Sequence, residues 1–257
     1  LKNINLDEPS TDYYNEIKNK LNYEYPYSFR VTKPASISVT EIKKIQNTYE
    51  EDLSQSFFNQ KIVLKRPLFI QENEEKEKIG GAERGTIVHL VMQVLDLNKV
   101  NTVYEIKEQI ELLIKKGIIT KKQSSVINSF KIYNFFKSSI GKRMLNSDFL
   151  KREQAIYTQV KMKDVYIYDD LLQGENNTYD EETLMVRGII DAYFEENGEI
   201  VLLDYKTDFV SDENKEKVIS RYEKQLELYS EALEKLTGKR VKEKCIYLFG
   251  IDEAISY

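Results

Sequence analysis

The sequence contains one cysteine, Cys245, and this scarcity excludes several kinds of site. One thiol cannot form a disulfide within the chain, and it cannot supply the four thiolates of a zinc or iron–sulfur site. A chain without a disulfide framework is typical of a reducing compartment, so we expect a cytoplasmic protein.

Long apolar runs are also missing. None reaches the roughly 18–20 residues that cross a bilayer, so we expect no membrane contact. Glycine and proline are scarce, at 10 and 4 of 257 residues, and no repeat or low-complexity tract occurs. The N-terminus, LKNINLDEPS, is not a signal peptide, and without an initial methionine we expect the chain to be part of a longer protein.

Neither sign of charge dominates the composition. Lysine and arginine number 38 and the acidic residues 43, so the formal net charge is −5. This balance gives no support for nucleic-acid binding, and any basic surface must be local. With 41% hydrophobic residues the chain can bury a core. Its length suits one large domain, alone or with an extension.

The first 50 residues differ from the rest, and we divide the chain into an N-terminal segment (1–50) and a main domain (51–257). We expect a short helix over about 10–21 and then an extended linker. Ser38 and Glu41 have the spacing of a capping box, which predicts a helix that begins at Val39.

The periodicity of the main domain changes near residue 152. A charged loop is expected first, over 66–83. Apolar residues then recur three or four apart, which predicts helices over 83–97, 103–116 and 120–138. Alternation follows, which predicts strands over 153–160, 164–172, 184–194 and 199–207. A helix over about 212–237, stopped by Gly238, and a strand over 244–251 complete the pattern. This order predicts an α/β fold: a mixed central sheet flanked by helices, with a helical N-terminal extension.

Residues 187–208, RGIIDAYFEENGEIVLLDYKTD, carry two acids and a lysine inside apolar runs. The Asn-Gly pair at 197–198 predicts a two-residue hairpin turn. In that register Asp191 lies directly opposite Asp204, with Cβ atoms ~4.5–5.5 Å apart, where like charges are destabilising. Lys206 points to the same face as Asp204. We therefore expect a positive charge between the two carboxylates.

Two interpretations of this hairpin stay open. Two convergent carboxylates suit Mg²⁺, which takes oxygen ligands. A bound metal lowers the pKa of its water and offsets charge on a phosphoryl oxygen, and a nearby lysine can orient that water. Alternatively, the hairpin is a solvated edge whose lysine bridges two surface acids. Apolar flanking residues favour a buried location: Ile189, Ile190, Leu202 and Leu203.

Four other polar residues are candidates, each with a simpler explanation. His89, the only histidine, lies on an apolar helix, either as a core residue or as a ligand that suits Mn²⁺ better than Mg²⁺. Gln225 interrupts an apolar helical stripe that contains Tyr229, either as a buried amide with partners or as an amide at the edge of the stripe. Glu153 heads a predicted strand and is, by itself, only an exposed acid.

Five motifs, taken in order, resemble the RecB-family branch of the PD-(D/E)XK nucleases: GTIVHLVMQ, REQAIYTQV, RGIIDAYF, LLDYKTD and QLELY. The resemblance spans about residues 80–250 and implies a mixed sheet flanked by helices. Earlier stretches resemble the approach to the nuclease domain in the AddA chain of AddAB ATP-dependent helicase–nucleases: LNYEYPY, SVTEIKKIQ and LKRPLF. On this resemblance 51–257 is a RecB-like nuclease domain, and 1–50 leads to it from a helicase part.

The resemblance also implies roles for individual residues. The metal, Mg²⁺ or Mn²⁺, would have four ligands: His89, Asp191, Asp204 and the carbonyl of Tyr205. Lys206 would position or activate the attacking water. Gln225 and Tyr229 match the family's Gln-x-x-x-Tyr motif, which supports the active site and the bound strand. Glu153 matches the acid of the second motif, with a less certain role.

The function implied is metal-dependent hydrolysis of phosphodiester bonds in single-stranded DNA, within a helicase–nuclease that processes double-strand-break ends for homologous recombination. The partners implied are DNA, fed by the helicase part, and an AddB-type subunit. No Gly-x-x-x-x-Gly-Lys-Ser/Thr loop occurs, so the motor must lie elsewhere.

The alternative is an inactive nuclease fold kept as a DNA-binding or subunit-docking module. Such domains normally lose an acid or the lysine, and this sequence keeps them all. A nuclease of the same fold from another pathway is disfavoured by the single cysteine and the N-terminal motifs.

Overall fold

The computed structural model describes residues 11–23, 31, 33–42, 44–45, 79–167, 182–208, 210–211 and 214–257. Most of the charged loop predicted over 66–83 lies outside these residues, and so does the greater part of the strand predicted over 164–172. No helix among the described residues is long and apolar enough to cross a membrane.

The N-terminal region contains the helix α1 (Thr11–Leu21) and the strand β1 (Ser36–Ser38). The capping box is confirmed. The Ser38 N–H donates to Glu41 Oε2 at 2.6 Å, the Glu41 N–H donates to Ser38 Oγ at 3.2 Å, and residues 39–42 are helical. Strand β1 was not predicted: it lies in the segment expected to be a linker, yet it joins the central sheet.

A helical layer follows. Its elements are α4 (Gly81–Val94), η2 (Leu97–Lys99), α5 (Val103–Lys115), α6 (Lys121–Ser124), α7 (Ser129–Lys137) and α8 (Ser139–Leu145). The single helix predicted over 120–138 is divided into α6 and α7, because the Asn128 side chain accepts the N–H groups of Phe130 and Lys131 and starts a new helix. Ser138 caps α8 in the same way through Gly141.

The remaining elements form the sheet and its second helical covering: β2 (Leu150–Lys161), α9 (Met162–Val165), β3 (Thr183–Glu196), β4 (Glu199–Lys206), α11 (Lys215–Thr237), β5 (Val241–Leu248) and β6 (Glu253–Ser256). Helix α9 contains the start of the strand predicted over 164–172, so that part of the prediction is wrong. Strands β2, β3 and β4 are successive antiparallel neighbours, as are β5 and β6. The pairs β1–β3 and β4–β5 are parallel, so the sheet is mixed, as predicted.

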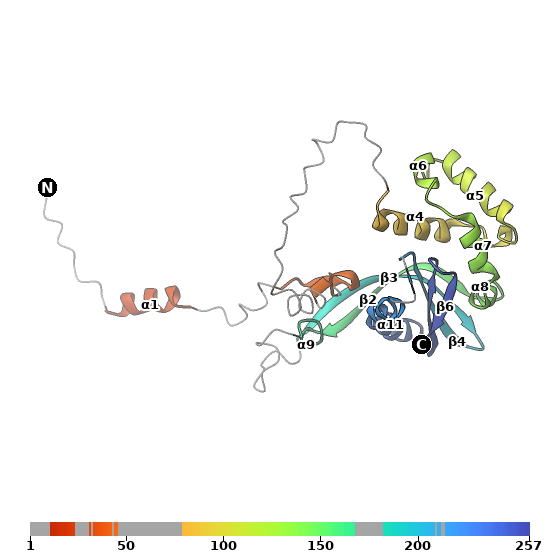
Figure 1. Ribbon diagram of the computed structural model, residues 1–257. Coiled ribbons are helices and arrows are strands. Elements are labelled where there is room, and N and C mark those ends of the chain that lie inside the picture. The colour runs from red at the N-terminus through yellow and green to blue at the C-terminus, as the bar shows by residue number, and fades with distance from the viewer. Residues whose placement is uncertain are drawn as a thin grey trace, which may run out of the picture.

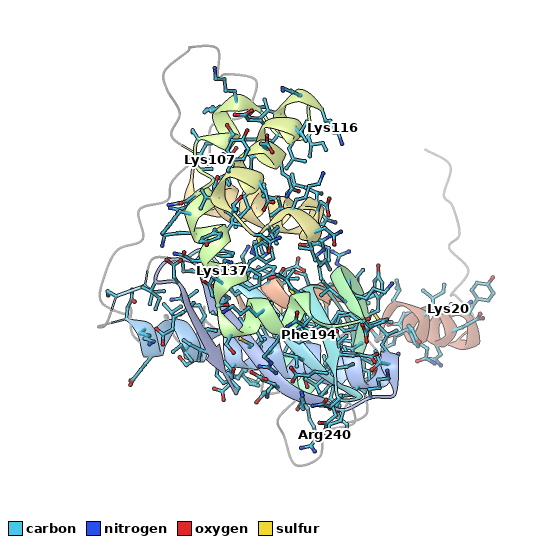
Figure 2. The ribbon with its side chains drawn as sticks, turned by 90° about the vertical axis from the view of Figure 1, so that its right-hand side faces the viewer. Lys20, Lys107, Lys116, Lys137, Phe194 and Arg240 are labelled. Carbon is cyan, nitrogen blue, oxygen red and sulfur yellow. The ribbon has the colours of Figure 1, made fainter. Side chains whose placement is uncertain are left out.

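Two cores lie on opposite faces of the sheet. Helices α4 to α8 cover one face and α11 covers the other (Figure 1). Along β4 the alternation is strict: Ile200 and Leu202 pack in the α11 core, whereas Val201 and Leu203 pack in the α4–α8 core. Phe194 of β3 also belongs to the α4–α8 core, and Figure 2 shows it within the sheet, below the helical layer.

The predicted hairpin turn is confirmed. Asn197 has φ 57° and Gly198 has φ 81°, and Glu196 pairs with Glu199. The β3–β4 ladder ends at the pair Ala192–Leu203. The expectation that Asp191 and Asp204 form the next directly opposed pair is therefore wrong, for a reason given with the site below.

One edge of β3 is shared by two strands. Strand β1 pairs with residues 185–187 and β4 pairs with residues 192–196, whereas β2 follows the opposite edge. No strand in the described part of the chain pairs with residues 188–191 on the shared edge. The sheet therefore has a gap in its hydrogen bonding at the middle of its longest strand.

Strands β2 and β3 both turn over beside this gap. Ile190 packs in the α11 core, but Ala192, two residues later, packs in the α4–α8 core. Strand β2 makes the same change between Ile156 and Leu150. Glu153 lies within that interval with a left-handed φ of 51°, which interrupts the normal alternation of faces.

Arg143 of α8 ties the helical layer to the sheet. Its Nε and Nη2 donate to the two oxygens of Glu196 at 2.9 Å, and Nη2 also donates to Glu243 at 2.6 Å. Hydrogen bonds from Arg143 and Lys242 lower the pKa of Glu196 to about 2. A lowered carboxyl pKa stabilises the native state only while the carboxyl is ionised, so this stabilisation is complete above the ordinary pKa of 4.5 and is lost as the pH falls toward 2.

Replacing Arg143→Met should lower the free energy of unfolding by about 1–2 kcal/mol at neutral pH, because two carboxylates lose their charged hydrogen-bond partner. The difference from wild type should shrink between pH 4.5 and pH 2, as the pKa of Glu196 requires. Chemical denaturation across this pH range measures both effects. Arg240→Met is the control: its side chain is 79% exposed and lies 3.8 Å from Glu199, so a change within about 0.5 kcal/mol is expected. A loss for Arg143→Met that stayed constant down to pH 2 would contradict this account.

Candidate active site

Polar side chains from three elements converge on the α4 side of the gap. His89 comes from α4, Glu153 from β2 and Asp191 from β3, and their ligating atoms lie within 4.8 Å of one another. All three line an open cleft of about 1020 Å³, and Lys206 of β4 lines it as well. The structure therefore brings together residues that are more than one hundred positions apart in the sequence.

Asp191 joins the two strands of the hairpin through its side chain. Its Oδ2 accepts the backbone N–H of Tyr205 at 2.6 Å, and its Oδ1 lies 2.8 Å from His89 Nδ1. The side chain thus bonds an N–H group of the neighbouring strand at the point where the ladder stops. This is why Asp191 does not face Asp204 as a ladder pair: its carboxylate turns into the gap between the strands.

His89 is half-buried at the cleft, with 28% of its side chain exposed. Burial alone would lower the pKa of His89, but the hydrogen bond to Asp191 and the charge of that residue raise it above its usual value. The imidazole meets the Tyr205 ring edge-on, at 6.1 Å between centroids and 75°. Of the two interpretations from the sequence, the structure favours a histidine that serves the cleft, because the ring contacts the cleft carboxylate.

Glu153 lies beside Asp191, because the flanking pairs Arg152–Ala192 and Gln154–Ile190 keep one register. It is half-buried, and burial raises its pKa, with the charge of Asp191 adding to the effect. A non-glycine residue with positive φ costs roughly 1–3 kcal/mol, and such strain is found mostly at functional sites. Glu153 is therefore more than an exposed acid at the head of a strand.

Asp204 lies on the other face of the sheet, with 2% of its surface exposed. Its Oδ1 accepts from Gln225 Nε2 at 3.1 Å, and its Oδ2 lies 2.5 Å from Lys206 Nζ. No hydrogen bond of good geometry reaches Oδ2 from the described residues. Burial raises the pKa of Asp204 and the charge of Asp191 raises it further, although Lys206 opposes both. Asp204 therefore stands next to the His89–Glu153–Asp191 group without belonging to it.

The Gln-x-x-x-Tyr motif of α11 fills the gap from below. The hydroxyl of Tyr229 is hydrogen-bonded to the Gln225 side chain and to the backbone of Ile189. Its ring packs so closely on Gly188 that a Cβ there would lie 2.6 Å from Tyr229 Cε1. The motif thus connects Asp204 to the unpaired edge of β3, and Gln225 is a buried amide with partners.

Two residues of the site were not predicted from the sequence. Arg152 Nη1 donates to the carbonyls of Met92 and Leu95, both at 2.9 Å, which ties the end of α4 to β2 beside Glu153. Gly188 allows the approach of Tyr229. The available signals were a cation next to the motif acid and a glycine inside an apolar strand, which often marks close backbone approach.

The donor set suits a divalent cation. One imidazole nitrogen with carboxylate oxygens from two strands fits a hard or borderline ion such as Mg²⁺ or Mn²⁺. The buried Oδ2 of Asp204, with an ammonium as its counter-charge, is a further oxygen nearby. Tyr205 contributes a backbone N–H to Asp191, while its side chain is buried in the α4–α8 core.

Comparison with known proteins gives consistent results. Residues 60–255 match the PD-(D/E)XK nuclease superfamily. The chain is 60% identical over 258 residues to the AddA-type ATP-dependent helicase/nuclease of Clostridioides difficile (strain 630). Proteins of the same name from Thermoanaerobacter sp. (strain X514) and Clostridium novyi (strain NT) are 42% and 40% identical. These comparisons cover 99–100% of this chain and 20% of each relative, so the chain spans about a fifth of their length.

Replacing Gly188→Ala should destabilise the protein by about 1–3 kcal/mol, because the new methyl group would overlap the Tyr229 ring. Thermal and chemical denaturation measure the loss. Gly80→Ala is the matched control, since a Cβ at Gly80 meets nothing within 4 Å and its φ of −69° suits alanine. Equal stability of Gly188→Ala and wild type would show that the ring of Tyr229 does not occupy this gap in solution.

Proposed function

The chain belongs to the PD-(D/E)XK nuclease superfamily, and we propose that it uses a divalent metal to hydrolyse phosphodiester bonds of single-stranded DNA. The observation that carries this proposal is the convergence of His89, Glu153 and Asp191 beside the buried pair Asp204–Lys206. Three acids and an imidazole, gathered with little solvent at a gap in a sheet, would destabilise the fold without a function to retain them.

Five groups are proposed as the metal ligands: His89, Glu153, Asp191, Asp204 and the carbonyl of Tyr205. The donor atoms of the first three are already within 4.8 Å of one another, and the raised pKa of Asp204 reflects a buried carboxylate that a cation would favour. Mg²⁺ is the proposed ion, and the imidazole makes Mn²⁺ acceptable. When bound, such an ion offsets charge on phosphoryl oxygens and lowers the pKa of water.

Lys206 is the proposed positioning group for the attacking water. Its side chain is 13% exposed, lines the cleft and is held between Asp204 and the face of Tyr222, whose ring centroid is 4.3 Å from Nζ. The water oxygen bonds to phosphorus, the bond from phosphorus to the leaving oxygen breaks, and that oxygen takes up a proton. An ammonium at this place stabilises the negative charge that develops on the phosphoryl group. Gln225 and Tyr229 keep Asp204 and β3 in position.

The wider role is proposed from the relatives. Their shared name describes an ATP-dependent helicase/nuclease, and their identity to this chain extends over its whole length. We propose that the chain is the nuclease module of such a protein in the cytoplasm. A helicase part would feed it single-stranded DNA, an AddB-type subunit would be its partner, and the complex would process double-strand-break ends for homologous recombination.

Replacing Asp204→Ala or Lys206→Ala should reduce cleavage of single-stranded DNA at least about 100-fold, because each removes charge that stabilises the transition state. Cleavage of an end-labelled oligonucleotide with Mg²⁺ or Mn²⁺ measures the effect, and circular dichroism establishes that each variant is folded. Lys116→Ala is the control for a lost ammonium, since Lys116 lies at the outer part of the helical layer (Figure 2). Wild-type rates in both site variants would refute the mechanism. A folded wild type that binds DNA but never cuts it would indicate the inactive alternative.

Metal should raise the melting temperature of the wild-type chain, because a ligand that binds only the native state stabilises it. At a concentration about 100 times the Kd the gain is about 2.7 kcal/mol. Differential scanning calorimetry with Mg²⁺ or Mn²⁺, and with EDTA as reference, measures it. Glu153→Gln keeps the size of the side chain but removes its charge, so it should show a smaller shift. A melting temperature that ignores saturating metal would count against the proposed ligands.

A further inference from the structure

Exposed apolar and aromatic side chains lie on the β2–β3 ribbon beside the site. Tyr157 is 71% exposed, Ile189 is 54% exposed and Met185 is 38% exposed. The expectation that Ile189 is buried with its apolar neighbours is therefore wrong, although Ile190, Leu202 and Leu203 are buried. The exposed residues share one face of the ribbon, as the cross-strand pairs show: Ala155–Ile189, Tyr157–Arg187 and Gln159–Met185.

The change of face at Glu153 and Asp191 explains why this surface is open. On this side of the change, the alternate residues Ile156, Val186 and Ile190 pack in the α11 core. The opposite side chains point to the face that α4 to α8 cover elsewhere, yet those helices do not extend over it. Figure 1 shows β2 and β3 running on toward α9, away from α5 to α8.

The exposed face is continuous with the site. Tyr157, Arg187 and Ile189 line the same cleft as Glu153 and Asp191. Two residues along a strand span roughly 6.7 Å, so the Tyr157–Arg187 pair lies roughly 13 Å from the acidic residues. That distance corresponds to about four nucleotides at a stacked spacing of about 3.4 Å, and to fewer in a stretched strand.

We propose that Tyr157, Arg187 and Ile189 form a stacking track that binds the single DNA strand next to the bond that is cut. The proposal rests on the proposed function and adds the site that holds the strand. Tyr157 offers an exposed ring on which a base can stack, Ile189 offers an apolar surface one step nearer the acids, and Arg187 contacts a phosphate. Base stacking on aromatic side chains tolerates any sequence, because every base has a π-face.

The distribution of charge fits a polyanion and orients it. Among the described residues that line the cleft, the carboxylates Glu153 and Asp191 gather around His89, whereas the guanidinium of Arg187 lies at the other end. A strand is therefore attracted at the track and reaches the acids only at the proposed metal. A duplex keeps its base faces inside the helical stack, so this surface favours a single strand.

Fluorescence anisotropy with a labelled single-stranded oligonucleotide tests the track, in EDTA so that no cleavage occurs. Tyr157→Ala should weaken binding by the 257-residue chain about five- to tenfold, because a stacked base loses its platform. Tyr157→Phe keeps the ring and should bind like wild type. The matched control is Tyr104→Ala, which removes a 69% exposed tyrosine of α5 outside the cleft and should leave binding unchanged.

The salt dependence of binding separates the role of Arg187 from that of Tyr157. Arg187→Ala should reduce the slope of log K against log salt concentration by about one, because one phosphate contact is lost. Tyr157→Ala should leave the slope unchanged. Arg240→Ala is the control for a lost guanidinium, since Arg240 lies at the end of the molecule away from the helical layer (Figure 2).

Several outcomes would overturn the track: no binding of single strands by wild type, unchanged affinity in both Tyr157→Ala and Arg187→Ala, equal loss in Tyr104→Ala, or equal loss of duplex binding in Tyr157→Ala. Cleavage assays on the same proteins separate this inference from the proposed function. If wild type cuts DNA while the track variants bind normally, the track is wrong and the nuclease stands. If wild type never cuts, yet the track variants lose single-strand binding, the nuclease is wrong and the track stands.

Discussion

The hydrogen bond from the Tyr205 N–H to the Asp191 carboxylate is the contact on which the site depends. It ends the β3–β4 ladder one pair earlier than the hairpin register would allow, and it turns Asp191 toward His89. The edge of β3 between β1 and β4 is thereby left open. Tyr229 and Gln225 fill the opening from the α11 side, and the cleft occupies the other side. Without that carboxylate a buried N–H group would lose its partner, so the same side chain serves the fold and the chemistry.

The site concentrates features that a stable sheet normally avoids. Burial raises the pKa of both Asp204 and Glu153, and the nearby charge of Asp191 adds to each effect. Glu153 also has a left-handed backbone within a strand. Such features persist where the surroundings impose them, here through Arg152 and the continuous β2–β3 register. A divalent cation and a polyanionic substrate would relieve the repulsion between the acids, which is the physical reason to associate this strain with function.

Local rules were reliable wherever a few neighbouring residues decide the structure. The capping box at Ser38, the turn at 197–198 and the stop of α11 at Gly238, with φ 68°, all follow from such rules. The predictions failed where longer-range contacts decide. Asn128 interrupts an apolar helical pattern, β1 gains its strand geometry only by pairing with β3, and Ile189 is exposed because no helix extends over its face.

The sequence by itself determined the residue types of the site, the hairpin that carries Asp191 and Asp204, and the α/β order of elements, because turn chemistry, periodicity and motif spacing are local. Only the tertiary structure decided that Glu153 joins His89 and Asp191, that Asp204 turns to Gln225 and Lys206, and that one face of β2–β3 stays open. These results depend on where each strand stops pairing and on which side of the sheet a helix packs. Both are set by the competition of the whole chain for burial and hydrogen bonds, which spacing along the sequence does not record.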